Sequence, residues 1–131
     1  IGQDIEMNIM SNLDFLLEND IPIYICDDSE SDNVLQKVQE IQKIYPNISY
    51  HKNNHRQGHD KNLLNSLKKP NEDYIWVMSD STVIINEMLP IICSEIELNS
   101  PDLLSVNKDC ISWDNLAFTL GITISIISFS I

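Results

Sequence analysis

Short apolar runs alternate with amphipathic stretches along the chain. The runs are rich in β-branched and aromatic residues and have the length of buried strands. They predict strands at 21–26, 48–51, 74–78 and 103–106. Between them, apolar residues recur at the 3.6-residue spacing of helices that face a core. The predicted helices cover about 7–17, 33–45, 60–68 and 86–98. This alternation through short links predicts an α/β, Rossmann-like fold, in which helices flank a mostly parallel sheet.

The apolar stretch 116–131 is too short, and too rich in Thr and Ser, for a membrane span. Its alternation of Ile with Thr or Ser predicts a strand over 121–131 instead. No signal peptide opens the chain, and the three cysteines, Cys26, Cys93 and Cys110, are far apart and odd in number. We therefore expect a reducing, cytoplasmic setting, which includes the inner face of the membrane.

The length of the chain indicates how many domains it holds, and its charge excludes one class of partner. The 131 residues correspond to one domain, 1–131, and the first residue is Ile, so we expect part of a longer protein. With 20 acidic residues against 8 basic ones, the net charge is −12. Such a surface repels phosphate backbones, and the basic residues do not cluster, so no nucleic-acid partner is expected.

Two acidic motifs follow predicted strands. Asp27-Asp28-Ser29 comes after the run that ends at Cys26, and Ser79-Asp80-Ser81 comes after Met78. Ligands of open α/β sheets bind outside the carboxyl ends of the strands. Carboxylates gathered there suit a divalent cation, a nucleobase N–H or sugar hydroxyls. Asp and Ser also form turns and helix caps at such places, and this structural role is the alternative.

A polar loop between the motifs leads into the third predicted helix. Gly58 permits a close backbone approach to a ligand, and the start of a helix offers free N–H groups to an anion. Lys61 and Asn62 fall in the first turn of this helix. Its inner face is predicted to carry leucines, namely Leu63, Leu64 and Leu67.

Four segments in this order resemble the inverting family 2 glycosyltransferases. They are D-D-S-E-S-D, P-N-I-S-Y-H-K-N, G-H-D-K-N-L-L-N-S-L and D-Y-I-W-V-M-S-D-S, and the resemblance covers roughly 21–96. It implies the nucleotide-diphospho-sugar transferase fold, often called GT-A. It also implies transfer of a sugar from a nucleoside-diphosphate donor, with a uridine diphosphate sugar expected, to a glycan or lipid-linked acceptor.

The resemblance also implies roles for single residues. The acidic pair after a strand, here Asp27 and Asp28, binds the nucleobase, and the sequence leaves open which of them makes the contact. The family's G-x-x-x-N helix start matches Gly58 and Asn62, with Lys61 at a position where a basic residue is frequent. The first position of its D-x-D cluster, which binds a divalent metal (Mn or Mg) and the diphosphate, matches Asp80.

The chain departs from the family in three places. Ser81 and Thr82 stand where a second metal carboxylate is expected, and hydroxyls are weaker ligands. The family's opening strand would come before the first predicted helix, and we expect it to be missing from this chain. The family's catalytic base lies well downstream, and the carboxylates nearby, Asp109 and Asp114, lack a recognisable motif. We therefore expect a partial domain that does not turn over a sugar nucleotide efficiently by itself.

Two other functions compete with this interpretation. A response-regulator receiver domain would use Asp27 and Asp28 as its acidic pair, Asp80 as phospho-acceptor and Lys108 as charge partner. Against it, a helix precedes the acidic strand, and the loop after Asp80 lacks Pro and Gly. A degenerate, non-catalytic scaffold module is the second alternative, because the second carboxylate is missing.

Zinc is not expected. The three histidines, His51, His55 and His59, are spaced by four, but they fall across a predicted strand end and a loop, not on one helix.

Overall fold

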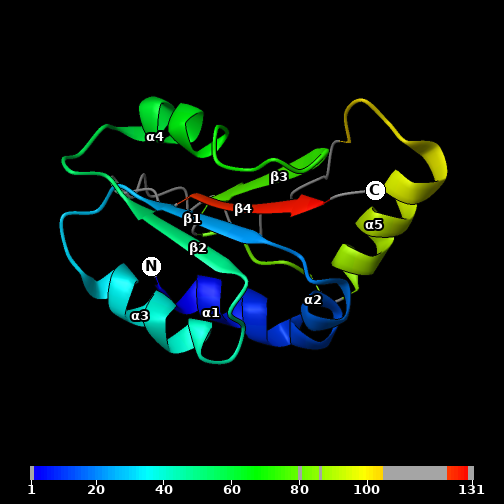
Figure 1. Cartoon of the computed structure of the whole chain (residues 1–131), viewed down its shortest axis with the longest axis horizontal. Helices are drawn as coiled ribbons and strands as arrows, with labels where there is room; N and C mark the ends of the chain where they lie inside the picture. Colours follow the sequence, from blue (N-terminus) through cyan, green and yellow to red (C-terminus); the bar gives the residue numbers. More distant parts are fainter. Residues whose placement is uncertain (1, 80, 86, 105–123, 130–131) are drawn as a thin grey trace, which may run out of the picture.

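A computed structural model describes residues 2–79, 81–85, 87–104 and 124–129. Among these residues, four strands form one sheet in the order β2-β1-β4-β3 (Figure 1). They are β1 (Ile23–Asp27), β2 (Ile48–Lys52), β3 (Tyr74–Ser79) and β4 (Ile124–Phe129). β1 pairs parallel with β2, whereas β4 is antiparallel to both of its neighbours, β1 and β3. Three strands therefore share one direction, which confirms the mostly parallel sheet, and the strand predicted over 121–131 is the one that runs against them.

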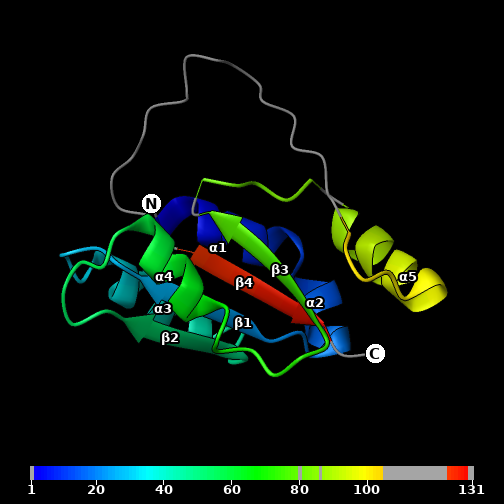
Figure 2. The same cartoon turned by 90° about the horizontal axis from the view of Figure 1, so that it is seen from above.

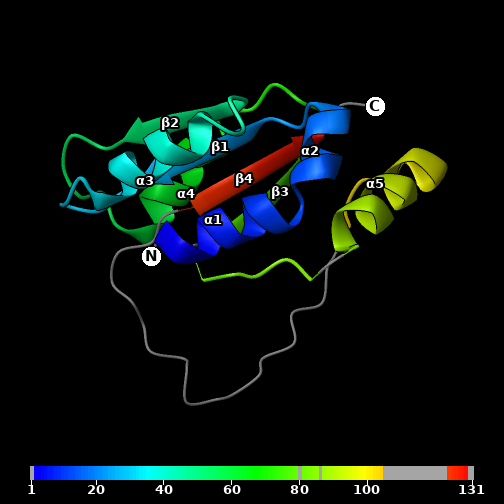
Figure 3. The ribbon, with the colours of Figure 1, turned by 90° about the horizontal axis from the view of Figure 1, so that it is seen from below.

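Helices cover both faces of this sheet. They are α1 (Gly2–Ser11), α2 (Leu13–Asn19), α3 (Asn33–Gln42), α4 (His59–Ser66) and α5 (Met88–Asn99). α1, α2 and α3 lie on one face and α4 lies on the other (Figures 1 and 3). α5 lies beyond β3, at that side of the sheet (Figure 2). No helix among the described residues is long and apolar enough to cross a membrane.

Two predicted elements differ in the structure. The single helix expected over 7–17 is two helices, because the helix breaks at Asn12. The Asn12 amide turns back and donates to the carbonyl oxygen of Asn8, a local bond of the kind that competes with helix continuation. The strand expected over 103–106 is absent at Leu103 and Leu104, and the rest of that range lies outside the described residues.

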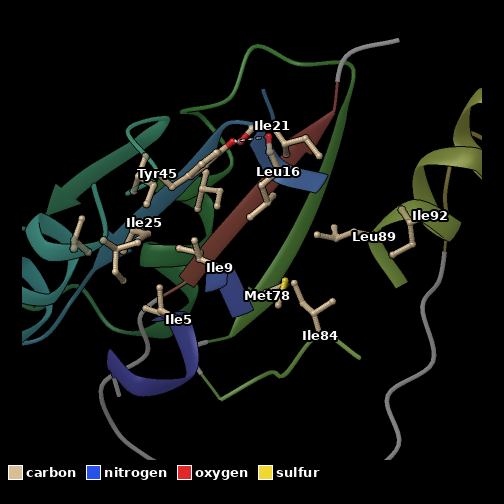
Figure 4. Close-up of a cluster of buried hydrophobic side chains, with 14 of the residues drawn as sticks. Ile5, Ile9, Leu16, Ile21, Ile25, Tyr45, Met78, Ile84, Leu89 and Ile92 are labelled. Carbon is tan, nitrogen blue, oxygen red and sulfur yellow. Dashed lines mark hydrogen bonds between the residues drawn. The ribbon is translucent and has the colours of Figure 1, made fainter. Parts of the chain in front are cut away.

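The hydrophobic core lies between the sheet and the layer of α1, α2 and α3 (Figure 4). Ile25 of β1 is fully buried, and Ile5 and Ile9 contribute from α1. Tyr45 is also buried, and its hydroxyl donates to the carbonyl oxygens of Leu16 and Ile21 (Figure 4). These bonds join the stretch between α2 and β1 to the turn that follows α3. They therefore fix the position at which β1 begins.

α4 buries a polar face rather than its leucines. Asn62 and Ser66, four residues apart, are fully buried, whereas Leu64 is 59% exposed and Leu67 is 38% exposed. The prediction that Leu64 and Leu67 face the core was therefore wrong. α4 sits against the end of β1, where backbone groups need hydrogen-bond partners that leucine side chains do not offer.

Candidate functional site

The carboxyl ends of β1 and β3 lie at the same edge of the sheet. Cys26 in β1 and Ser79 in β3 are both register partners of Ile124 in β4. Two strand spacings therefore separate them, on the order of 10 Å. Asp80 follows Ser79 directly in sequence but lies outside the described residues. That its carboxylate shares a crevice with the pair after β1 remains a prediction.

Asp27 is a fully buried carboxylate at the end of β1. One oxygen accepts the backbone N–H of Ser29 at 2.8 Å, and the other accepts the Tyr50 hydroxyl at 2.6 Å. Tyr50 stands on β2, opposite Ile25. Burial first, then the bond and charge of Asp27, raise the pKa of Tyr50 well above its ordinary value of 10.0. The hydroxyl is therefore a fixed donor to this carboxylate.

Asp28 is 4% exposed and binds the loop that leads into α4. Its Oδ1 accepts the Asn53 amide and the Gln57 backbone N–H, both at 2.7 Å. Its Oδ2 accepts the Gly58 backbone N–H at 2.8 Å. One carboxylate thus ties the end of β1 to three points of the loop 53–58, and Oδ2 keeps acceptor capacity for a further donor.

These bonds keep Asp28 ionised. Burial acts to raise its pKa, but the bonds from Gln57, Asn53 and Gly58, together with the charge of Arg56, outweigh burial. The net result is a pKa below the ordinary value of 3.8. A buried negative charge is therefore present at this edge of the sheet at neutral pH.

Asn62 completes the same network from α4. Its amide nitrogen donates to the carbonyl oxygen of Cys26 at 3.2 Å, and its amide oxygen accepts the Asn53 amide at 3.0 Å. Because the side chain is fully buried, these bonds fix α4 against β1. Asn62 therefore binds both the loop and the strand.

Gly58 and Lys61 stand on the exposed side of the same junction. Gly58 precedes α4 with φ of 85°, in the left-handed region that favours glycine. A Cβ added there would meet no heavy atom within 4 Å, so the backbone is open to close approach from that side. Lys61 is exposed in the first turn of α4. The Asp28 carboxylate already takes the N–H of Gly58, which reduces the attraction of this helix start for a second anion.

Three hydroxyl groups from the segment that follows β3 lie close to one another. The Ser79 hydroxyl lies 2.9 Å from that of Thr82 and 3.2 Å from that of Ser81. The Thr82 N–H donates to the Ser79 carbonyl oxygen at 3.1 Å and closes a turn. The described residues supply only neutral oxygens here, and Asp80 is the one carboxylate in the motif.

The residues described do not form a metal site by themselves. Among them, no group of three or more His, Cys, Asp or Glu side chains is placed to hold a metal ion. His51, His55 and His59 are all exposed. The arrangement therefore gives no ligand set through which a metal-dependent step can be derived.

Sequence reasoning missed Tyr50 and Asn53 as parts of the site. Asn53 lies just beyond β2, and its N–H also bonds the Asp27 carbonyl oxygen, which places it beside the acidic pair. Parallel pairing of consecutive strands was the available signal, because it sets the end of β2 next to the end of β1. Lys108, Asp109 and Asp114, which the sequence singled out, lie outside the described residues.

A separate cavity of about 550 Å³ lies at the other end of β3. Tyr74 and Trp76 line it from the strand, Ile92 and Ile96 line it from α5, and Asp102 also lines it. None of the residues of the β1 edge lines this cavity. The acidic network and the cavity are therefore distinct features of the surface.

Comparison with known protein families gives a match over most of the chain. The model of a protein family described as glycosyl transferase family 2 matches residues 6–130. Searches among curated proteins and among solved structures gave no significant match. The matched range includes both acidic motifs and every strand described above, and it gives no support to the receiver-domain alternative. Members of this family transfer glycosyl groups from nucleotide-sugar donors to acceptors. The chain therefore belongs to glycosyl transferase family 2.

Proposed function

We propose that this domain binds the nucleoside diphosphate of a sugar nucleotide, with uridine diphosphate as the first candidate, at the carboxyl edge of β1 and β3. The observation that carries the proposal is the shared register of Cys26 and Ser79 on Ile124. It brings the ends of β1 and β3 to one edge of the sheet, where open α/β sheets bind ligands. The bond from the Gly58 N–H to Asp28 holds the start of α4 beside the end of β1.

Asp28 is the better candidate of the acidic pair for the base contact. Both oxygens of Asp27 accept hydrogen bonds, from Tyr50 and Ser29, and the side chain is fully buried. Asp28 is 4% exposed, and its Oδ2 can accept a further hydrogen bond. A nucleobase N–H is a donor that this oxygen suits. Asp28 would then do two things at once, because it also holds the loop next to the bound base.

The diphosphate would lie toward α4 and the turn after β3. Gly58 leaves its backbone open on one side, and Lys61 offers a cation in the first turn. Asn62 contributes indirectly, by holding α4 against β1. Asp80 is the proposed ligand of a divalent metal, manganese or magnesium, which would compensate diphosphate charge when bound. Neighbouring hydroxyls make a weak ligand set, so we expect weak metal affinity.

The proposed reaction transfers the sugar to an acceptor hydroxyl of a glycan or a lipid-linked sugar. The hydroxyl oxygen forms a bond to the anomeric carbon, and the bond from that carbon to the diphosphate oxygen breaks. A general base takes the proton of the hydroxyl, and the diphosphate leaves with the electron pair. No described residue is assigned as this base, so low turnover by the chain alone remains our expectation.

Titration calorimetry with uridine, guanosine and adenosine diphosphates, with and without manganese, tests the binding step. We expect binding of uridine diphosphate in the range below millimolar. Lys61→Ala should weaken it about two- to fivefold, the size of one exposed ion pair. Lys68→Ala removes the same charge beyond the far end of α4 and is the matched control. Absence of binding by all three nucleotides at millimolar concentration would refute the proposal.

A further inference from the structure

Asn8 is a polar residue on the buried stripe of α1. It lies between Ile5 and Ile9, which are both in the core, and it is only 9% exposed. An apolar side chain would pack at this position without needing hydrogen bonds. A buried amide, by contrast, is costly unless both of its polar atoms find partners. The sequence already carries this signal, since Asn8 falls at helical spacing among apolar positions.

Both partners of the Asn8 amide belong to the segment that follows β3. Its nitrogen donates to the carbonyl oxygen of Thr82 at 2.6 Å, and its oxygen accepts the N–H of Ile84 at 2.8 Å. These contacts span 74 and 76 residues of sequence. One side chain thus holds two backbone groups of the same short segment, much as a neighbouring strand would.

The segment is held at its other end by β3 itself. Met78 is buried next to Ile84 (Figure 4), and the Thr82 N–H closes the turn onto Ser79. The turn from Ser79 to Thr82 is the stretch of sequence that contains Asp80. Asn8, which lies outside this segment, hydrogen-bonds its backbone at Thr82 and Ile84, where the turn ends.

We propose that Asn8 is a positioning residue for the acidic turn after β3, and that nucleotide binding depends on it through the backbone of 82–84. This inference rests on the function proposed above. Asn8 lies in α1 and contacts the backbone of the turn rather than the exposed edge, so its effect on a ligand passes through that backbone. Loss of its two bonds leaves the buried Ile84 N–H and the partly buried Thr82 carbonyl oxygen without this partner.

Asn12, at the break between α1 and α2 and four residues after Asn8, provides a matched control. It is also a buried asparagine, 7% exposed, but its amide bonds the Asn8 carbonyl oxygen and the Ser11 hydroxyl, both local to α1. Asn12→Ala therefore removes a buried amide of the same kind without touching the turn. Asn8→Asp is the isosteric variant, since it keeps an acceptor for Ile84 and loses the donor to Thr82.

The experiment measures two quantities for wild type, Asn8→Ala, Asn8→Asp and Asn12→Ala. The first is the exchange rate of the Ile84 amide proton by nuclear magnetic resonance, and the second is affinity for uridine diphosphate by calorimetry. We expect Asn8→Ala to speed Ile84 exchange tenfold or more relative to Asn12→Ala. We also expect both Asn8 variants to weaken nucleotide binding about tenfold, while Asn12→Ala binds as wild type does.

The possible outcomes distinguish a failure of this inference from a failure of the proposed nucleotide binding. If wild type binds no nucleotide, the proposed function fails and this inference falls with it. If wild type binds and both Asn8 variants bind equally well, only the positioning role is overturned. Should Asn8→Ala fail to fold, Asn8→Asp decides the question. An equal loss of affinity in Asn12→Ala would also overturn the inference, since it would show a general effect of instability.

Discussion

Replacing Asp28 by asparagine should destabilise the fold far more than the same change at Asp27. Asp28→Asn leaves one oxygen for the donors that the carboxylate now accepts, and two of these donors are the backbone N–H groups of Gln57 and Gly58. At least one of them then faces the new NH₂ group, and a backbone N–H cannot turn away. A hydrogen bond to a charged group contributes about 1.5–3 kcal/mol, and a buried unpaired donor costs about 1–3 kcal/mol. We expect a loss of about 2–4 kcal/mol.

Asp27→Asn is the matched control, because it is isosteric, also lies at a buried position and removes the same charge. Its partners are the Ser29 N–H and the Tyr50 hydroxyl. The amide oxygen can accept from Ser29, and the amide nitrogen can donate to the Tyr50 oxygen, because a hydroxyl both donates and accepts. No backbone N–H is left facing another donor, and the Tyr50 hydroxyl can rotate its proton away, so we expect a loss of about 1 kcal/mol or less.

Urea unfolding at neutral pH measures the difference. With a urea slope of about 1–3 kcal/mol per molar, the midpoint of Asp28→Asn should fall by roughly 1–2 M, and that of Asp27→Asn by much less. The folded state lowers the pKa of Asp28, so the unfolded state takes up the proton first as the pH falls. The stabilisation is therefore complete above the ordinary value of 3.8 and is lost as the pH falls through the lower pKa of the folded chain. Equal midpoints for the two variants at neutral pH would refute the reasoning.

Three further predictions concern other side chains. Tyr50→Phe leaves one Asp27 oxygen without its donor and should lower the free energy of unfolding by about 1–3 kcal/mol, measured in urea. Burial raises the pKa of Tyr45 from 10.0 to about 12, so stability should decline as the pH rises from 10.0 through about 12, which tyrosinate absorbance and circular dichroism would follow together. In α5, Leu89→Ala should cost about 2–5 kcal/mol because Leu89 is fully buried, whereas Leu98→Ala, at a position 77% exposed, should cost less than about 0.5 kcal/mol; similar melting temperatures would contradict this.

Much of the strand framework was predictable, because local pattern determines it. The apolar runs that end on Asp27 and on Ser79 are β1 and β3 within one or two residues of their predicted bounds. The α5 helix also matches, with Pro90 near its start. Each of these features depends on residues that are neighbours in sequence, so periodicity and turn signals suffice.

The inner face of α4 and the partners of Asp28 were not predictable by the same means. Which face of a helix is buried depends on what it packs against, and α4 meets backbone groups at the end of β1 that bind Asn62. The leucine pattern alone therefore indicated the wrong face. The donors to Asp28 come from a loop 25 to 30 residues away, and only the parallel pairing of β1 with β2 brings them near.

The position of β4 has a consequence for how the chain reaches this fold. β1 and β3 do not pair with each other, and each pairs with β4 instead. Ile23 of β1 meets Ile127 of β4, a separation of 104 residues (127 minus 23). Contacts this distant in sequence slow folding, because the loop they close must be ordered before they form. We expect the sheet to assemble late, from a β1-β2 half and a β3 half that stay separate until β4 enters between them.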